Sequence, residues 1–206
     1  MQPSGPVQEA NLQSTSFSVE RSTLEPLLAP RRGSRLMLIA TETFKREVLR
    51  PIGTQSSSES ALEAHGEWTR ALVGATTLGL EGGAGGKFGT ERILPVYDRY
   101  AIGGAATLRG YDEEEFHVDR FALSRLELRR LLGRAQRVFL FWDHAWMQTR
   151  LPIDLTSDRI DTMQRDGIGF GMRLETAGGV VGIDYGLEPG RAPVEGKIHL
   201  RLVSAF

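Results

Sequence analysis

The chain has no cysteine among its 206 residues. This absence excludes a disulfide framework, a thiolate metal site and a cysteine nucleophile. The sequence also contains no apolar run near the roughly 20 residues that a membrane-spanning helix needs. A transmembrane β-barrel stays compatible with this composition, because its strands alternate apolar and polar residues and therefore have a low mean hydropathy. The length is sufficient for one or two domains with a sizeable core.

An excess of positive charge is also missing. The chain has 25 basic and 26 acidic side chains and a net charge of -1. A nucleic-acid-binding protein normally has a clear basic excess, so we expect no nucleic-acid partner. The four histidines lack metal-ligand spacing, no G-x-S-x-G motif is present, and Gly82–Thr90 departs from a phosphate-binding loop because Phe88 follows Lys87. We therefore expect no enzymatic activity, no metal and no cofactor.

No signal peptide is visible at the start of the chain. Residues Met1–Asn11 have no basic region, no apolar region and no cleavage site. Either the protein remains inside the cell or this chain lacks its natural N-terminus.

Alternation of apolar with polar or small residues is the strongest pattern that is present. A period of two residues is typical of strands with one apolar face. Three C-terminal segments show it clearly: Gly167–Thr176, Gly179–Glu188 and Lys197–Phe206. The looser candidates upstream are Ser34–Arg46, Ala61–Leu72, Thr76–Ala84 and Arg137–Gln148, and the weakest is Leu12–Ser22. Asp119–Arg130 is rich in helix formers, but we predict a strand there because tertiary context often overrides local propensity.

The connections between these predicted strands alternate between tight and long. Leu72–Ala75 and Thr176–Gly179 are tight, whereas Glu47–Ser60, Val96–Val118 and Thr149–Arg165 are long. Outer-membrane barrels have short periplasmic turns and longer extracellular loops. A soluble β-sandwich or lipocalin-like barrel gives no reason for this asymmetry, so the loops favour a membrane barrel. The period of two does not by itself separate the two folds.

Residues 103–111, GGAATLRGY, resemble the GG-x-x-x-[VL]-R-G-[FY] signature of the bacterial surface antigen family. That family includes outer-membrane barrel-assembly insertases and two-partner secretion translocases. Four further resemblances follow in the family's order, and one precedes them: Ser124–Arg129 (SRLELR), Phe139–Asp143 (FLFWD), Gly167–Leu174 (GIGFGMRL), Val181–Tyr185 (VGIDY) and, upstream, Pro30–Ser34 (PRRGS). Two features depart from the family: Ser204 stands where an aromatic residue is usual, and the preceding POTRA repeats are absent.

The resemblance implies the C-terminal half of the family's barrel. We predict an all-β fold over residues 31–206, an antiparallel transmembrane β-barrel or partial barrel of about 8–9 strands. Residues 1–30 are then an N-terminal segment with one weak or truncated strand. If Leu12–Ser22 is a strand, nine strands leave an unpaired edge. If it is not, eight strands can close into a small barrel.

A candidate site also follows from the resemblance. In the family the long loop folds back into the lumen, and its motif residues here are Gly103, Gly104, Leu108, Arg109, Gly110 and Tyr111. The loop arginine meets acidic residues on the next two strands, which by motif are Glu127 and Asp143. Both acids have the parity opposite to the apolar residues, so we expect them to point inward. The planar guanidinium suits bidentate pairing with a carboxylate there.

Two other segments have simpler interpretations. The acidic run Asp112–Glu115 is interpreted as a solvated loop. In the C-terminal strand, Ile198, Leu200, Leu202 and Phe206 correspond to the family's barrel-assembly signal.

The function implied by the resemblance is to help insert or translocate β-rich client proteins at the bacterial outer membrane. The implied partners are the outer-membrane bilayer and unfolded outer-membrane or secreted proteins, with accessory lipoproteins or upstream POTRA repeats as further candidates. A second hypothesis is a passive barrel anchor of a larger secreted protein of the patatin-like lipase type. A third is a soluble β-barrel or sandwich that binds an apolar ligand. A requirement for detergent separates the third from the others, and the upstream gene sequence separates the first two.

Overall fold

The computed structural model describes residues 7–25, 30–49, 53–90, 93–133, 136–154, 156–176 and 179–203. Nine long strands of this part of the chain form one sheet. They are β1 (Val7–Ser22), β2 (Gly33–Leu49), β3 (Gly53–Ala71), β4 (Thr76–Gly89), β7 (Arg120–Leu131), β8 (Arg137–Pro152), β9 (Asp158–Thr176), β10 (Gly179–Leu187) and β11 (Lys197–Val203). Neighbours in the sheet are neighbours in this series, and every pairing is antiparallel.

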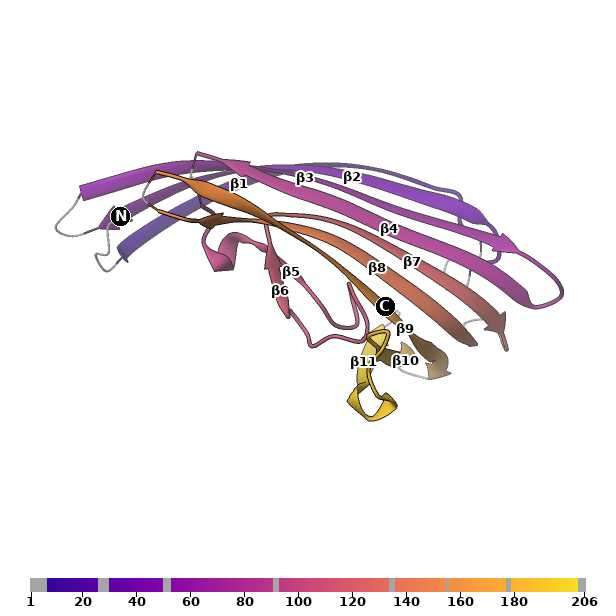
Figure 1. The fold of residues 1–206 in the computed structure, drawn as a ribbon. Helices are drawn as coiled ribbons and strands as arrows, with labels where there is room; N and C mark the ends of the chain where they lie inside the picture. The colour runs from indigo at the N-terminus through magenta and orange to yellow at the C-terminus, as the bar shows by residue number, and fades with distance from the viewer. Residues whose placement is uncertain are drawn as a thin grey trace.

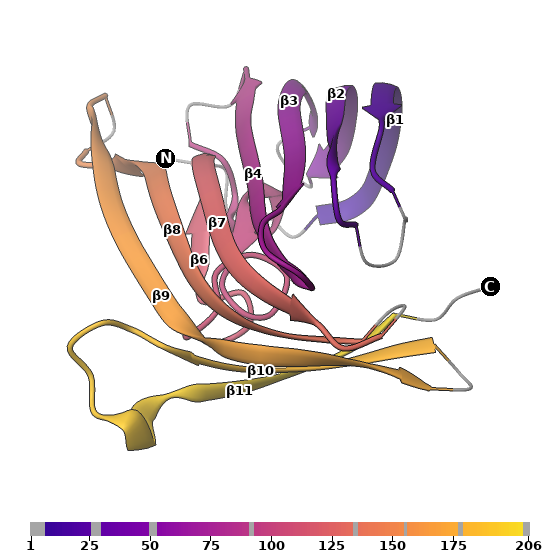
Figure 2. The ribbon, with the colours of Figure 1, turned by 90° about the vertical axis from the view of Figure 1, so that its right-hand side faces the viewer.

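The sheet is strongly curved. Figure 1 shows its long strands side by side, and Figure 2 shows that they bend into an open trough. Within the described residues no pairing joins β1 to β11, so the barrel wall is open along these two edges. The predicted all-β partial barrel is confirmed. Leu12–Ser22 lies in β1, so the interpretation with nine strands and an open edge is the one observed.

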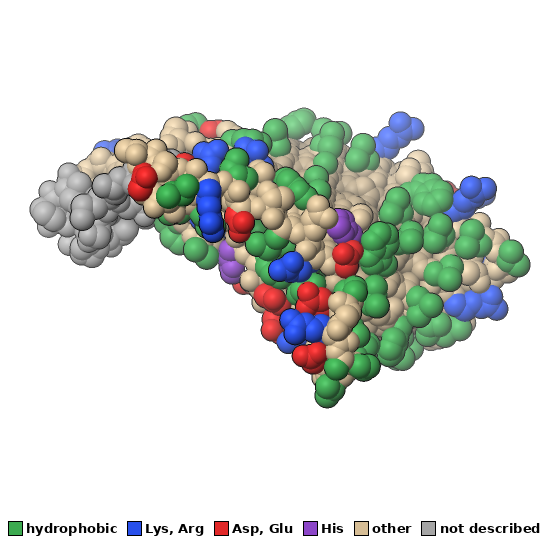
Figure 3. Space-filling model, viewed as in Figure 1, with side chains coloured by type: hydrophobic (Ala, Val, Ile, Leu, Met, Phe, Trp, Pro, Cys, Tyr) green, Lys and Arg blue, Asp and Glu red, His purple; other side chains and the backbone are tan. Residues whose placement is uncertain are grey.

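The two faces of the sheet differ as the alternation predicts. Outward-facing apolar side chains are exposed on the convex face, as for Leu140 (61% exposed) and Leu200 (73%). The neighbours of Leu140 in the chain, Phe139 and Phe141, face the concave side and are buried. This arrangement explains why the first half of β8 is apolar on both parities. Figure 3 shows hydrophobic side chains gathered over the right-hand part of the molecule. No helix of the described chain is long and apolar enough to cross a membrane.

The structure contradicts two of the three predicted long loops. The segment Thr149–Arg165 is mostly strand, because β8 continues to Pro152 and β9 begins at Asp158. Likewise, most of Glu47–Ser60 is strand, because β2 continues to Leu49 and β3 begins at Gly53. These ends of the strands are mostly polar, and isolated apolar residues such as Leu151, Ile160 and Met163 do not keep one parity, so they show no regular alternation to detect. Between β1 and β2, cross-strand hydroxyl pairs join Ser14 to Thr43 at 3.0 Å and Ser16 to Thr41 at 2.9 Å.

The turn between β8 and β9 is organised by Asp154. Ser157 donates its hydroxyl to one oxygen of this carboxylate at 2.6 Å, and the backbone N–H groups of Thr156 and Ser157 donate to the other. These hydrogen bonds hold the pKa of the Asp154 carboxyl well below its usual range. A tight polar turn therefore replaces the long loop that the sequence suggested.

The third predicted loop is real. Residues 90–119 connect β4 to β7 and contain the 3-10 helix η1 (Val96–Asp98) and a small hairpin of β5 (Tyr100–Ile102) with β6 (Phe116–Val118). A second short 3-10 helix, η2 (Pro193–Glu195), lies between β10 and β11. Figure 2 shows the β5–β6 segment inside the trough, against the concave face of the sheet.

Candidate functional site: the inward loop and its ionic anchor

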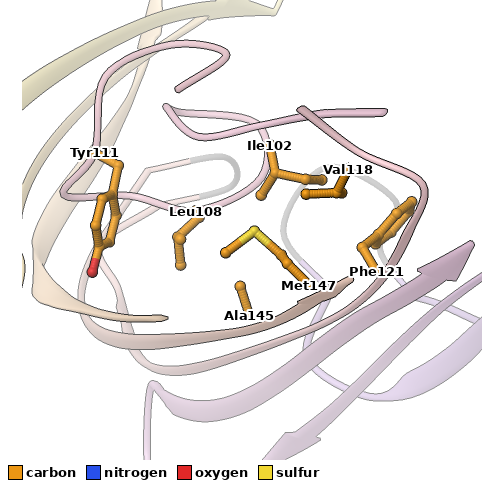
Figure 4. Close-up of a cluster of buried hydrophobic side chains, with 7 residues drawn as sticks. All are labelled: Ile102, Leu108, Tyr111, Val118, Phe121, Ala145 and Met147. Carbon is orange, nitrogen blue, oxygen red and sulfur yellow. The ribbon is translucent and has the colours of Figure 1, made fainter. Parts of the chain in front are cut away.

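The loop between β5 and β6 is fixed to the sheet by an apolar cluster. Its members are Ile102, Leu108, Tyr111, Val118, Phe121, Ala145 and Met147. Leu108 and Tyr111 belong to the loop, whereas Ala145 and Met147 face inward from β8 (Figure 4). Leu108 is fully buried. Burial of these side chains removes apolar surface from water and so holds the loop within the trough.

Glycine is required where the loop turns sharply. Gly103 and Gly104 have φ values of +129° and +85°, which other residues rarely adopt. A Cβ on Gly103 would lie 2.3 Å from the Asp112 carbonyl oxygen. The Thr107 hydroxyl closes the turn, since it donates to the Gly103 carbonyl at 2.9 Å and accepts the Gly103 N–H at 2.8 Å. The first two glycines of the motif therefore shape the loop that presents Arg109.

Arg109 lies at the centre of the site and has no exposed surface. Its Nε donates to Asp143 Oδ2 at 2.8 Å and its Nη2 to Asp143 Oδ1 at 2.7 Å, which makes the pairing bidentate. Its Nη1 donates to Glu127 Oε1 at 2.7 Å. The backbone N–H of Arg109 also donates to Asp143 Oδ2 at 3.1 Å. The structure thus brings together the three charged residues that the family motif singles out, on the loop, β7 and β8.

The ionic contacts extend along the concave face. On the Glu127 side, Arg129 Nε donates to Glu127 Oε2 at 2.8 Å, and its Nη2 is bonded to Glu81. On the Asp143 side, Arg125 Nε lies 3.3 Å from Oδ1. An aromatic ring also packs against the cation, since the Arg109 guanidinium lies 3.5 Å from the centroid of the Phe141 ring. Each of the buried charges described here, on Arg109, Glu127, Arg129 and Asp143, therefore has an ionic partner, as a buried ionic group requires.

The strands under the loop contain glycines that were not predicted as site residues, although Gly167 begins one of the segments that resemble the family. A Cβ on Gly167 would lie 1.9 Å from the Arg109 carbonyl oxygen, and one on Gly186 would lie 2.5 Å from the Gly110 nitrogen. Gly110 has a φ of +97° and itself lies against the backbone at Leu187. The signal was available in the sequence, because inward-parity glycines on adjacent strands indicate a close approach of another segment.

Other participants were also missed. Arg173 pairs with Asp184, both nearly buried, and the Asp184 carboxylate lies 3.9 Å from Arg109 Nη1. The Gly110 N–H donates to His199 Nε2 at 3.2 Å. Asp184 and His199 have inward parity on predicted strands, and Asp184 also lies in the segment Val181–Tyr185 that resembles the family, but neither was predicted as a site residue.

The acidic run beside the motif is only partly a solvated loop. Asp112 and Glu113 are largely exposed, yet Lys197 Nζ lies 2.7 Å from Asp112. Glu113 accepts the Ala105 N–H at 2.8 Å. Among the described residues, no group of three or more histidine or acidic side chains is arranged to hold a metal ion. The chemistry that the site supports is the immobilisation of a loop by charge and packing.

In the C-terminal strand, Ile198, Leu200 and Leu202 face outward and are 71%, 73% and 69% exposed. Phe206 lies outside the described residues.

The comparison with known proteins agrees with this geometry. The family model of the Omp85 superfamily domain matches residues 8–202. The chain belongs to the Omp85 superfamily. Among solved structures, BamA from Haemophilus ducreyi lacking POTRA domains 1–3 is similar to this Omp85 chain, with a TM-score of 0.67 at 14% sequence identity. No curated protein sequence matches it.

The match covers 91% of this chain and 41% of that BamA chain. The Omp85 chain therefore spans less than half the length of the BamA structure. At this level of identity the comparison establishes the fold.

Proposed function

We propose that this Omp85 chain resides in the bacterial outer membrane and helps to insert or translocate β-rich client proteins. This proposal rests on one observation: β11 is an unpaired edge strand of the described sheet, and the outward face of that sheet is apolar. A free edge presents unpaired backbone groups, and an incoming strand can pair with them by β-augmentation. Membership of the superfamily and the BamA-like fold support this choice.

In this mechanism the wall and the loop have separate tasks. The client strand pairs with the backbone of β11, while the outward side chains of that strand lie in lipid. The Arg109 anchor keeps the loop inside the trough and so holds β7 and β8 at a fixed curvature. No bond of the client is made or broken, and we propose no enzymatic activity.

A cysteine cross-linking experiment tests the edge. Because the chain has no cysteine, a single introduced thiol is unique. Leu200→Cys places it on the outward face of the edge strand, and side chains on adjacent strands approach to about 5 Å there. Leu140→Cys is the matched control, since Leu140 is also outward-facing but has Leu128 and Phe170 on both sides.

The client is a urea-unfolded eight-stranded barrel with one cysteine in its last strand, added to vesicles that hold the variant. We expect disulfide cross-links with Leu200→Cys and none above background with Leu140→Cys. Equal cross-linking of both variants, or of neither, contradicts the edge mechanism. Failure of the edge together with normal membrane insertion would favour the passive-anchor hypothesis.

A further inference from the structure

Two arginines on neighbouring strands face outward near the loop-rich end of the sheet. Arg120 on β7 is opposite Gln148 on β8, and Gln148 shares the parity of the outward residue Leu140. Arg150 lies two positions beyond Gln148 and therefore faces the same side. This end of the wall also bears the long connection of residues 90–119, so in the proposed orientation it is extracellular.

The position of Arg120 relative to the bilayer can be inferred from its spacing to a second arginine of the same strand. Arg120 and Arg130 are ten positions apart and have the same parity. Ten residues span about 33 Å of strand, or about 25 Å of bilayer at a tilt of about 40°. The outward positions between them are small or apolar: Ala122, Ser124, Leu126 and Leu128. The spacing of Arg120 and Arg130 along β7 therefore matches one hydrocarbon thickness, and in the proposed orientation Arg120 lies at the extracellular boundary.

A pocket of about 180 Å³ lies at this boundary. The Phe88 ring covers Gly86 and lies 4.8 Å from the Arg120 guanidinium. Arg120 Nη1 donates to Gln148 Oε1 at 3.4 Å, a long hydrogen bond. The remaining lining residues are Lys87, Gly89, Leu94, Asp119, Arg150 and Ile160. The pocket thus combines apolar walls with several charged groups.

Two of the charged residues that line the pocket, Lys87 and Asp119, already have partners of opposite charge. Lys87 is paired with Glu59 at 3.0 Å, and Asp119 is paired with Arg99 at 3.3 Å. Asp119 also accepts the backbone N–H of Arg150 at 2.6 Å.

The two outward guanidinium groups remain without an acidic partner. Across the part of the chain that the structure describes, no carboxylate lies within 4.0 Å of the guanidinium of Arg120 or Arg150. Arginine forms charge-assisted, often bidentate hydrogen bonds with phosphate groups. Two uncompensated guanidinium groups at the headgroup level therefore favour an anionic headgroup.

We propose that Arg120 and Arg150 bind the phosphate group of an outer-leaflet lipid. The acyl chains of this lipid lie below the pocket, against Ala122 and the adjacent outward residue Trp146. An aromatic residue at this level is usual in outer-membrane barrels. The proposal rests on the proposed membrane location, and it adds a lipid class and a site.

The test uses the full chain reconstituted in phosphatidylcholine nanodiscs that contain a small fraction of phosphatidic acid. Native mass spectrometry of the released protein counts the phosphatidic acid molecules that stay bound. We expect Arg120→Gln and Arg150→Gln each to weaken retention about fivefold, the effect of one arginine near an anionic lipid. Arg130→Gln is the matched control, because it removes an outward arginine of the same strand at the opposite boundary, and it should retain the lipid as the wild type does.

Three results would overturn the site. Equal loss in Arg120→Gln and Arg130→Gln means that only general charge attracts the lipid. Retention of plain phosphatidylcholine as strong as that of phosphatidic acid means that the phosphate is not recognised. Displacement of bound phosphatidic acid by millimolar inorganic phosphate means that the pocket takes free phosphate and that the acyl chains contribute nothing.

Insertion is measured separately by resistance of the sheet to protease in the nanodisc. A chain that inserts but shows no arginine-dependent retention disproves the lipid site and leaves the proposed function standing. A chain that does not insert disproves both.

Discussion

At the scale of the residue, Arg109 joins three parts of the fold through one guanidinium group. It belongs to the loop, yet its hydrogen bonds end on β7 at Glu127 and on β8 at Asp143. Because all three side chains are buried, removal of the cation would leave two carboxylates without their main partner. The bidentate contact with Asp143 also makes the shape of the guanidinium important, and not its charge alone.

We expect Arg109→Ala to lower the free energy of unfolding by about 3 kcal/mol or more, the usual cost of breaking a buried ion pair. Arg109→Lys should restore little, because an ammonium group cannot form the bidentate contact. Urea unfolding in detergent–lipid mixtures measures both. A double-mutant cycle with Asp143→Ala should give strongly non-additive effects. Arg191→Ala, in an exposed loop, is the control and should stay within about 0.5 kcal/mol of the wild type.

Gly167 gives a prediction of a different kind, because its substitution adds an atom. The Cβ of Gly167→Ala would lie 1.9 Å from a backbone oxygen of Arg109, so either the loop or β9 must move. We expect a destabilisation of about 1–3 kcal/mol, typical of overpacking, and faster proteolysis within residues 103–118. Gly66→Ala is the matched control, since its Cβ meets only the Arg35 carbonyl oxygen at 3.9 Å. Equal protease sensitivity of the two variants would contradict this packing.

At the scale of the element, each strand divides its side chains between two environments. In β11, Leu200 is exposed on the convex side, whereas Arg201 reaches into the trough and donates to the Ala105 carbonyl of the loop. The same alternation was readable in the sequence for the C-terminal strands. It was not readable at the mostly polar ends of β2, β3, β8 and β9, where isolated apolar residues do not keep one parity.

Leu200→Arg should therefore cost about 2–4 kcal/mol if its position lies near the middle of the bilayer. Arg201→Leu should cost about 1 kcal/mol, because it loses a hydrogen bond but no lipid contact. Unfolding of the two variants in lipid vesicles gives the order directly. If Arg201→Leu is the more damaging change, the assignment of the two faces is incorrect.

At the scale of the whole molecule, the fold was more predictable than the site. Strand order and the inward loop followed from alternation and from the resemblance of GGAATLRGY to a known motif. The acids Glu127 and Asp143 were chosen by motif and parity, and the structure places both at Arg109. The inward parity of Arg129, Asp184 and the glycines Gly167 and Gly186 was readable in the sequence. They were not predicted as site residues, because their partners depend on which strands become neighbours across a curved sheet. Such proximity is a property of the assembled wall and leaves little trace in local sequence.

The membrane location can be tested on the intact chain. Expressed with an added signal peptide, the chain should fractionate with outer membranes and need detergent for release, because its convex face exposes many large apolar side chains. Resistance to extraction by alkaline carbonate separates an inserted chain from one that is only adsorbed. Recovery as a soluble, detergent-independent monomer would instead favour the soluble alternative.

The direction of the two open edges limits what can complete the wall. Eight antiparallel pairings separate β1 from β11 in the described sheet, so these two strands point the same way. Additional strands that close the barrel by antiparallel pairing with both β1 and β11 must begin and end with a strand of the opposite direction. Because direction alternates from strand to strand, their number is odd. A second copy inserted in the same orientation presents its β1 and β11 in the original direction. Two copies side by side would meet through parallel pairings.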